Sequence, residues 1–220
     1  MKLLYTRTVT AATQHGTQFD LEVDANLPTS PAITGALVAN ASRIPRMTVE
    51  NCLIRNKRNR GILAQVQNSE IKNCAFQNVL HGAVSMVSAK DVFSEGTVPR
   101  DVRVYNCKFL SNSESDIVAA RSGGTIVADT LSDIKAFNNF FYGGKGYGVY
   151  YYAAGGGEIR NNLSYNGAAR AAIYVRTSEG VTVKDNYAYR DSPLEGWCVF
   201  NNADSTGTIE SNNVFDVKGE

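Results

Sequence analysis

The chain has 220 residues, of which 43% are apolar, so it is long enough to fold as one domain around a sizeable core. Its formal net charge of +1 gives no electrostatic reason to expect nucleic acid or an acidic membrane surface as a partner. No run of about 18 apolar residues occurs, so no membrane-spanning helix is expected.

The first part of the chain, residues 1–35, is predicted to form a β-hairpin or barrel-like element separate from residues 36–220. Apolar and polar residues alternate in Tyr5–Thr10 and Thr17–Val23, as they do in strands. His15-Gly16 marks a turn between the two runs. An isolated hairpin is marginal in water, so this element makes a poor domain on its own.

The rest of the chain repeats one unit. Val49-Glu50-Asn51-Cys52 is followed 22 residues later by Ile71-Lys72-Asn73-Cys74. Five more copies begin at Val104, Ala136, Ile159, Val183 and Ile209. A period of this length, with short alternating runs, is typical of a parallel β-solenoid, whose inner face is buried only when neighbouring coils stack. The repeat predicts an all-β fold: a right-handed single-stranded parallel β-helix, a pectin-lyase-like solenoid of about seven coils, with a small N-terminal β-hairpin element.

The spacing of the copies also identifies two insertions. Most copies are 22–26 residues apart, but two offsets are 33 and 32 residues. The additional residues are expected within Val87–Arg100 and Ala120–Ser132.

One column of residues repeats at a bend of every coil. Stacked coils place such residues about 4.8 Å apart, where asparagine amides can bond to their neighbours in a ladder. The thiols in this column are predicted to pack inward as small apolar groups. Without a CxxC pair, and with only His15 and His81 as histidines, no metal site or other cofactor is expected. The predicted column consists of Cys52, Cys74, Cys107, Asn139, Asn162, Asn186 and Asn212.

Aromatic residues gather on one strand and its neighbours. Tyr147 and Tyr150–Tyr152 lie on one predicted strand, with Tyr174 and Trp197 on the next two coils. Inward-facing rings are core, whereas outward-facing rings form a stripe whose flat faces suit sugars or protein partners. Tyr151 and Trp197 are therefore candidates for substrate binding.

A longer pattern resembles a known enzyme family. Asn56–Leu63 reads NKRNRGIL and resembles the N-x-R-A-R-G segment of glycoside hydrolase family 110, the α-1,3-galactosidases. Asn40–Arg46 resembles the segment that leads into this motif, and His81–Val84 resembles the strand after it. Ser94–Gly96 and Asp101–Val104 resemble the family's E-S-G turn and the D-V-x-I run that follows it.

The resemblance is best over residues 34–112. It implies a right-handed parallel β-helix with inserted barrel-like subdomains, and a metal-independent inverting hydrolase of terminal α-galactosides. The family's catalytic aspartates lie in a run upstream of the motif, whereas this sequence contains no Asp-Asp pair. Asn59 also stands where the family has alanine.

Inverting glycosidases use two carboxyl groups about 6.5–9.5 Å apart. The candidate catalytic residues near the motif are Asp116, Glu95 and Glu114. Arg58, Arg60 and His81 are predicted to lie beside Asp116 and to bind substrate, because a guanidinium donates paired hydrogen bonds to sugar hydroxyls or carboxylates. Structural pairing of these arginines with Asp116 or Glu114 is the alternative.

Three functions remain open from the sequence. The first is an inverting glycoside hydrolase, either complete or the C-terminal portion of a longer one. The second is a non-catalytic glycan-binding, adhesin-like or tailspike-like module, and the third is a relative of the polysaccharide lyases and pectinases. The expected partner is an oligosaccharide or polysaccharide, with self-association or an upstream chain at the open ends of the β-helix. The first residues do not resemble a signal peptide, so the chain is expected to be cytoplasmic or a piece of an exported, periplasmic or extracellular protein.

Overall fold

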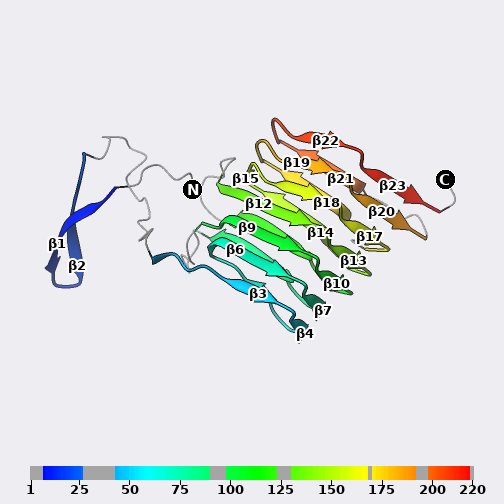
Figure 1. Cartoon of the computed structure of the whole chain (residues 1–220), viewed down its shortest axis with the longest axis horizontal. Helices are drawn as coiled ribbons and strands as arrows, with labels where there is room; N and C mark the ends of the chain where they lie inside the picture. Colours follow the sequence, from blue (N-terminus) through cyan, green and yellow to red (C-terminus); the bar gives the residue numbers. More distant parts are fainter. Residues whose placement is uncertain are drawn as a thin grey trace. The chain divides into compact units, whose positions relative to one another are not determined.

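The computed structural model describes residues 7–26, 43–89, 98–122, 130–167, 170–191 and 198–218. All of its regular elements are β-strands (Figure 1). The chain divides into two compact units, Lys2–Ala41 and Ser42–Glu220. Both this boundary and the predicted one at residues 35–36 fall outside the described residues.

The first unit contains one antiparallel hairpin of β1 (Val9–His15) and β2 (Gln18–Val23). Its turn includes Gly16, whose φ of 63° is unfavourable for most other residues. The first strand starts later than predicted and continues to His15. Nearly all the side chains of the hairpin are exposed, so the described part of this unit has no core of its own.

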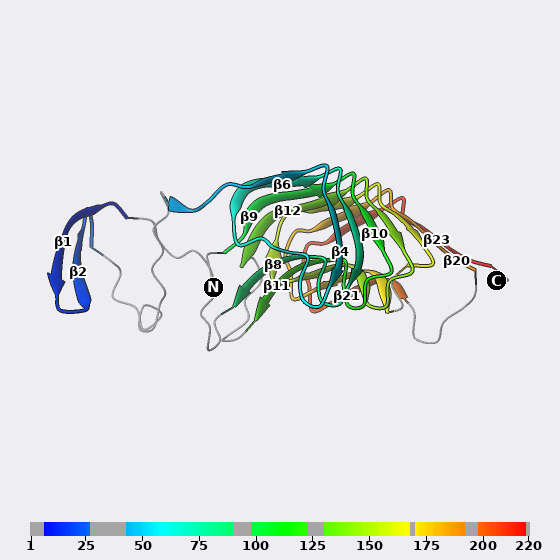
Figure 2. The same ribbon diagram turned by 90° about the horizontal axis from the view of Figure 1, so that it is seen from below.

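The described residues of the second unit form a parallel β-helix of seven coils, in which most coils contribute one strand to each of three parallel sheets (Figures 1 and 2). Sheet 1 contains β3 (Thr48–Glu50), β6 (Gln67–Lys72), β9 (Arg100–Tyr105), β12 (Leu131–Phe137), β16 (Glu158–Arg160), β19 (Thr182–Lys184) and β22 (Ile209–Ser211), and β15 (Ala154–Gly155) also pairs with β12. Sheet 2 contains β4 (Leu53–Lys57), β7 (Ala75–Val79), β10 (Lys108–Leu110), β13 (Phe140–Tyr142), β17 (Leu163–Tyr165), β20 (Tyr187–Arg190) and β23 (Val214–Val217). Sheet 3 contains β5 (Ile62–Leu63), β8 (Val84–Ala89), β11 (Ile117–Ser122), β14 (Tyr147–Tyr152), β18 (Ala171–Arg176) and β21 (Cys198–Ala203).

The repeat therefore predicted the fold correctly. Val49 pairs with Ile71, and Ile71 with Val104, as the sequence copies align. The two insertions lie between β8 and β9 and between β11 and β12, where residues 90–97 and 123–129 are outside the described residues. Inward-facing residues form one continuous core, which includes a stack of Phe76, Phe109 and Phe141 with centroids 5.0 and 5.1 Å apart.

Each coil bends sharply between sheet 1 and sheet 2. The bend needs a left-handed residue, a conformation that asparagine and aspartate adopt more readily than other residues with a side chain. The residues that supply it have φ between 52° and 56° and are Asn51, Asn73, Asn106, Asn138, Asn161, Asp185 and Asn212.

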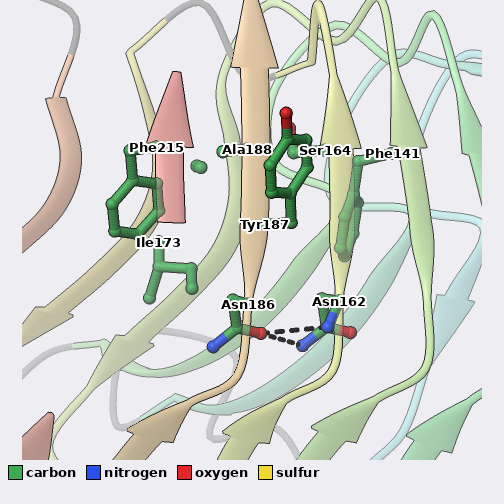
Figure 3. Close-up of a pocket in the computed structure, with 9 residues that line it drawn as sticks. Phe141, Asn162, Ser164, Ile173, Asn186, Tyr187, Ala188 and Phe215 are labelled. Atoms are coloured by element: carbon green, nitrogen blue, oxygen red, sulfur yellow. Dashed lines mark hydrogen bonds between the residues drawn. The ribbon is translucent and has the colours of Figure 1, made fainter. Parts of the chain in front are cut away.

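In the first six coils, the residue after the left-handed position belongs to the predicted ladder. The Asn139 backbone N–H and Nδ2 both donate to Asn162 Oδ1, at 3.0 and 3.1 Å. Asn162 donates in the same way to Asn186 Oδ1, at 3.1 and 2.9 Å (Figure 3). Asn162 Nδ2 also donates to the Ala136 carbonyl at 3.0 Å, so one buried amide joins three successive coils.

The last coil corrects one predicted alignment. Val183 pairs with Glu210, not with Ile209, so the ladder ends at Asn213 and Asn212 is the left-handed residue. Asn213 Oδ1 accepts from the Asn186 N–H at 3.0 Å. Glu210, which pairs with the buried Val183, is polar and exposed, and this departure from the apolar pattern disguised the register in the sequence.

We expect Asn162→Ala to destabilise the protein by about 3 kcal/mol, because it removes the acceptor of the buried Asn139 N–H, the side-chain donor to the Ala136 carbonyl and one of the two donors to Asn186 Oδ1. Asn161→Gly is the matched control, since it keeps the left-handed bend at an exposed position and should cost less than about 1 kcal/mol. Urea unfolding of both variants measures the difference. Equal losses would show that the ladder is not the stabilising feature of the bend.

Candidate functional site

A hollow of about 310 Å³ lies at the beginning of sheet 3. Polar side chains from the turns between sheets 2 and 3 border it, and side chains of β8 and β11 form its floor. The residues that line it are Asn59, Arg60, His81, Gly82, Ser85, Val87, Glu114 and Val118.

The stacking of coils brings His81 and Glu114 together. Each residue lies three positions before one of a pair of neighbours in sheet 3, Val84 and Ile117. His81 Nδ1 and Glu114 Oε1 are 2.8 Å apart, and the two side chains are 46% and 58% exposed. An exposed pair of this kind adds about 1 kcal/mol or less to stability, so its polar groups remain available to a ligand.

The floor of the hollow combines apolar and close-packed groups. Val87 and Val118 face outward from neighbouring strands. The Ser85 hydroxyl donates to the Gly82 carbonyl at 3.3 Å, and a Cβ atom at Gly82 would collide with that hydroxyl. The sequence analysis did not predict these floor residues, although their positions in the repeat, a few residues after His81 and Glu114, could have identified them.

Arg60 reaches the hollow from the turn after β4. Its backbone N–H donates to Asn59 Oδ1 at 2.9 Å. Its guanidinium forms no ion pair with any residue in the described ranges. Arg58 is exposed in the same turn but does not line the hollow.

The structure corrects the expected placement of Asp116. This residue is 2% exposed, does not line the hollow, and accepts a hydrogen bond of 2.7 Å from Asn112 Nδ2. Burial raises the pKa of Asp116 to about 7, although the bond from Asn112 acts in the opposite direction. Asp116 thus does not lie on the same open edge as Arg60 and His81, and it pairs with neither arginine.

Two other predicted residues, Glu95 and Trp197, lie outside the described residues. Tyr151 is fully buried, and its hydroxyl donates to the Ile134 carbonyl at 3.1 Å. Burial holds the pKa of Tyr151 far above its usual range. This ring belongs to the core, because strand alternation turns Tyr150 and Tyr152 outward instead.

The outward tyrosines stack on one another. On sheet 3, Tyr150 lies 5.3 Å from Tyr174, with 11° between their planes. On sheet 2, Tyr165 lies 5.9 Å from Tyr142 and 5.3 Å from Tyr189. The faces between stacked rings are covered, so these stripes present mainly ring edges and hydroxyls, in contrast to the expected row of open faces.

A second, much smaller cavity lies on the inner side of sheet 2, where Ser164 and Ala188 stand between Phe141 and Phe215 in the column of inward-facing rings (Figure 3). Its volume is about 10 Å³. A space of this size holds about one water molecule, so it is not a ligand site.

The cysteine column behaves as a continuation of the asparagine ladder. The Sγ atoms of Cys52, Cys74 and Cys107 each lie 3.1–3.2 Å from a carbonyl of the same coil. Burial raises the pKa of Cys74 and raises that of Cys107 to about 12, so both remain protonated donors. The thiols of Cys74 and Cys107 are buried as predicted, whereas Cys52 in the first coil is exposed.

Within the described ranges, no three His, Cys, Asp or Glu side chains gather as a metal site would require. A search of the described residues for a helix with the length and apolar character needed to span a bilayer found none.

Fold and site together define a parallel β-helix protein with an asparagine ladder and a polar hollow at the start of one sheet. The chain belongs to the NosD family: residues 26–218 match the family described as "Periplasmic copper-binding protein (NosD)". The resemblance to the α-1,3-galactosidases finds no support in these comparisons.

No curated protein matches the chain. Among solved structures, trypsin-treated QnrB1, a plasmid-mediated fluoroquinolone resistance protein, is 11% identical over 75% of this chain and 91% of its own. Its TM-score of 0.17 is too low to indicate a shared fold.

We expect the stability gained by Asp116→Asn, relative to the wild type, to increase with pH. The pKa of Asp116 is about 7 in the folded state and 3.8 in the unfolded state. Below pH 3.8 the carboxyl is protonated in both states and does not change the free energy of unfolding. As the pH rises from 3.8 to about 7, the unfolded state releases this proton first, so the wild type loses stability. The difference should reach at most on the order of 4 kcal/mol. Urea unfolding between these pH values measures it, with Glu114→Gln as the exposed control. A constant difference across this range would contradict the assignment.

Proposed function

We propose that this NosD-family β-helix binds carbohydrate in the hollow at the start of sheet 3. The observation that carries the proposal is the convergence of Arg60, His81 and Glu114 above the apolar floor of Val87 and Val118. Concave sites that combine apolar contact area with a few convergent polar groups are typical of small-ligand binding. The volume of about 310 Å³ lies at the lower end of such sites and suits one or two sugar units.

The side chains supply complementary hydrogen bonds. Arg60 contributes donors in a fixed planar arrangement, and Glu114 contributes an acceptor for sugar hydroxyls. His81 contributes a ring nitrogen, whose role as donor or acceptor depends on the tautomer of the imidazole. The valine side chains offer contact area for the C–H groups of a sugar ring. These features support binding without requiring an open aromatic face.

The carboxylates near the hollow support binding of a sugar better than hydrolysis of a glycosidic bond. An inverting enzyme needs an acid and a base on opposite sides of the scissile bond. Among the described lining residues, Glu114 is the only carboxylate, and it is already paired with His81. Asp116 is withdrawn into the core.

The family description names copper, which proteins bind through His, Cys or Met side chains. The described residues contain no group of three or more His, Cys, Asp or Glu side chains that could hold a metal ion. Cys74 and Cys107 are protonated donors to carbonyls, whereas metal binding requires thiolates. The described part of this chain does not fit copper, and no copper chemistry is proposed for it. A periplasmic location, also named in the description, is proposed from family membership alone.

The binding proposal can be tested by affinity electrophoresis of the full chain in native gels that contain a neutral or an acidic polysaccharide. At least one polysaccharide should retard the wild type. Arg60→Gln and Glu114→Gln should each reduce the retardation about tenfold, the effect of losing one or two hydrogen bonds to a ligand. Lys184→Gln, on the outer face of sheet 1, is the control. No retardation by any polysaccharide, or equal retardation of all variants, would contradict the proposal.

The absence of hydrolysis is tested separately. We expect neither the wild type nor Asp116→Asn to release galactose from an α-1,3-linked galactosyl oligosaccharide, because the described hollow contains no second carboxylate. Galactose is measured by coupled oxidation after prolonged incubation. Turnover by the wild type that disappears in Asp116→Asn would establish a hydrolase instead.

A further inference from the structure

The first coil contains a cluster of four positive side chains, named here the basic cluster: Arg55, Lys57, Arg58 and Arg60. All four are exposed. None forms an ion pair within 4.0 Å with a carboxylate of the described residues. The whole chain has a net charge of only +1, so this positive charge is a local feature that the surrounding surface does not neutralise.

Cations on sheet 1 behave differently. Lys72 lies 3.1 Å from Glu70 and 3.6 Å from Glu50. Arg103 lies 3.3 Å from Asp101, and farther along the sheet a glutamate likewise pairs with an arginine of β16. Carboxylates therefore neutralise these three cations on the outer face of sheet 1. The contrast identifies the first coil as a surface that attracts anions.

The basic cluster leads directly to the hollow. Ile54 packs against the core, so Arg55 faces outward from sheet 2. Asn56, with φ of 56°, then turns the chain toward sheet 3. Arg60 at the end of the turn lines the hollow itself. The charges thus extend from the outer face of sheet 2 to the rim of the candidate sugar site.

We propose that the glycan bound at this site is an acidic polysaccharide, whose carboxylates contact the basic cluster while one sugar unit occupies the hollow. This inference rests on the proposed carbohydrate binding. Guanidinium groups bind carboxylates through paired, charge-assisted hydrogen bonds, and several such charges along one chain reinforce one another. Glu114 is already paired with His81, which leaves Arg60 available to a ligand carboxylate.

Nucleic acid fits the same surface less well. Single-stranded nucleic acid is held by aromatic faces on which bases stack, together with an extended positive groove. The outward tyrosines of sheets 2 and 3 stack on one another and cover most of these faces. The basic cluster is also confined to one coil. An acidic glycan needs neither open rings nor a long positive groove.

The test compares polygalacturonate with the same polymer after chemical reduction of its carboxyl groups, using the full chain. We expect the wild type to bind polygalacturonate about tenfold more tightly than the reduced polymer, and this preference to weaken as salt rises from about 50 to about 300 mM. The triple variant Arg55→Gln, Lys57→Gln, Arg58→Gln should lose most of the preference, with the remainder due to Arg60, and should retain its affinity for the reduced polymer. It leaves Arg60 and the hollow intact.

The control is a triple variant with the same change in charge, Lys108→Gln, Lys135→Gln, Lys184→Gln, on outer faces of other coils. It should retain the preference, and circular dichroism should show that both triple variants are folded. Equal binding of the two polymers, equal effects of the two triple variants, or tighter binding of a single-stranded oligonucleotide would overturn the inference while carbohydrate binding stands. Binding of neither polymer nor any other polysaccharide would overturn both proposals.

Discussion

The parallel pairing of each coil with the next is the constraint on which the rest of the structure depends. It satisfies the backbone along the strands, but at each bend it leaves polar groups inside the protein without strand partners. Buried N–H and C=O groups are costly when unpaired. The ladder solves this problem with one side chain per coil: Asn162 and Asn186 accept from the coil before and donate to carbonyls of earlier coils. The preceding residue, such as Asn161, supplies the left-handed turn that aims the amide inward.

The same column explains the cysteines without a metal. Cys74 Sγ lies 3.7 Å from the Val49 carbonyl in the coil before its own. Asn139 Nδ2 donates to the equivalent carbonyl, that of Val104, in the coil before its own. A protonated thiol therefore replaces the amide as a smaller and weaker donor in the same position. The hydrogen bonds from these thiols to backbone carbonyls explain the cysteine column without a metal ion. The column is therefore no evidence for copper, although the family is described as copper-binding and the described residues contain no fitting ligand set.

Stacking also decides which surface groups are available for function. Residues far apart in sequence become neighbours when they occupy the same position in successive coils, as His81 and Glu114 do. The same effect stacks tyrosine on tyrosine, which covers ring faces that would otherwise be open to a sugar. Carboxylates neutralise Lys72 and Arg103 on sheet 1, whereas the first coil retains its charge beside the hollow. The candidate site is therefore polar and cationic rather than aromatic.

The sequence by itself determined the coil, the number of coils, the N-terminal hairpin and the position of the ladder, because each follows from a local period that repeats along the chain. It did not determine the register of the last coil, where Asn213 takes the ladder position expected of Asn212. Nor did it place Tyr151 and Asp116, which were expected at a binding face and are buried. A shift of one residue along a strand moves a side chain from surface to core. Only the tertiary structure decided these placements and formed the hollow, because the direction and exposure of each side chain depend on the coils packed above and below it.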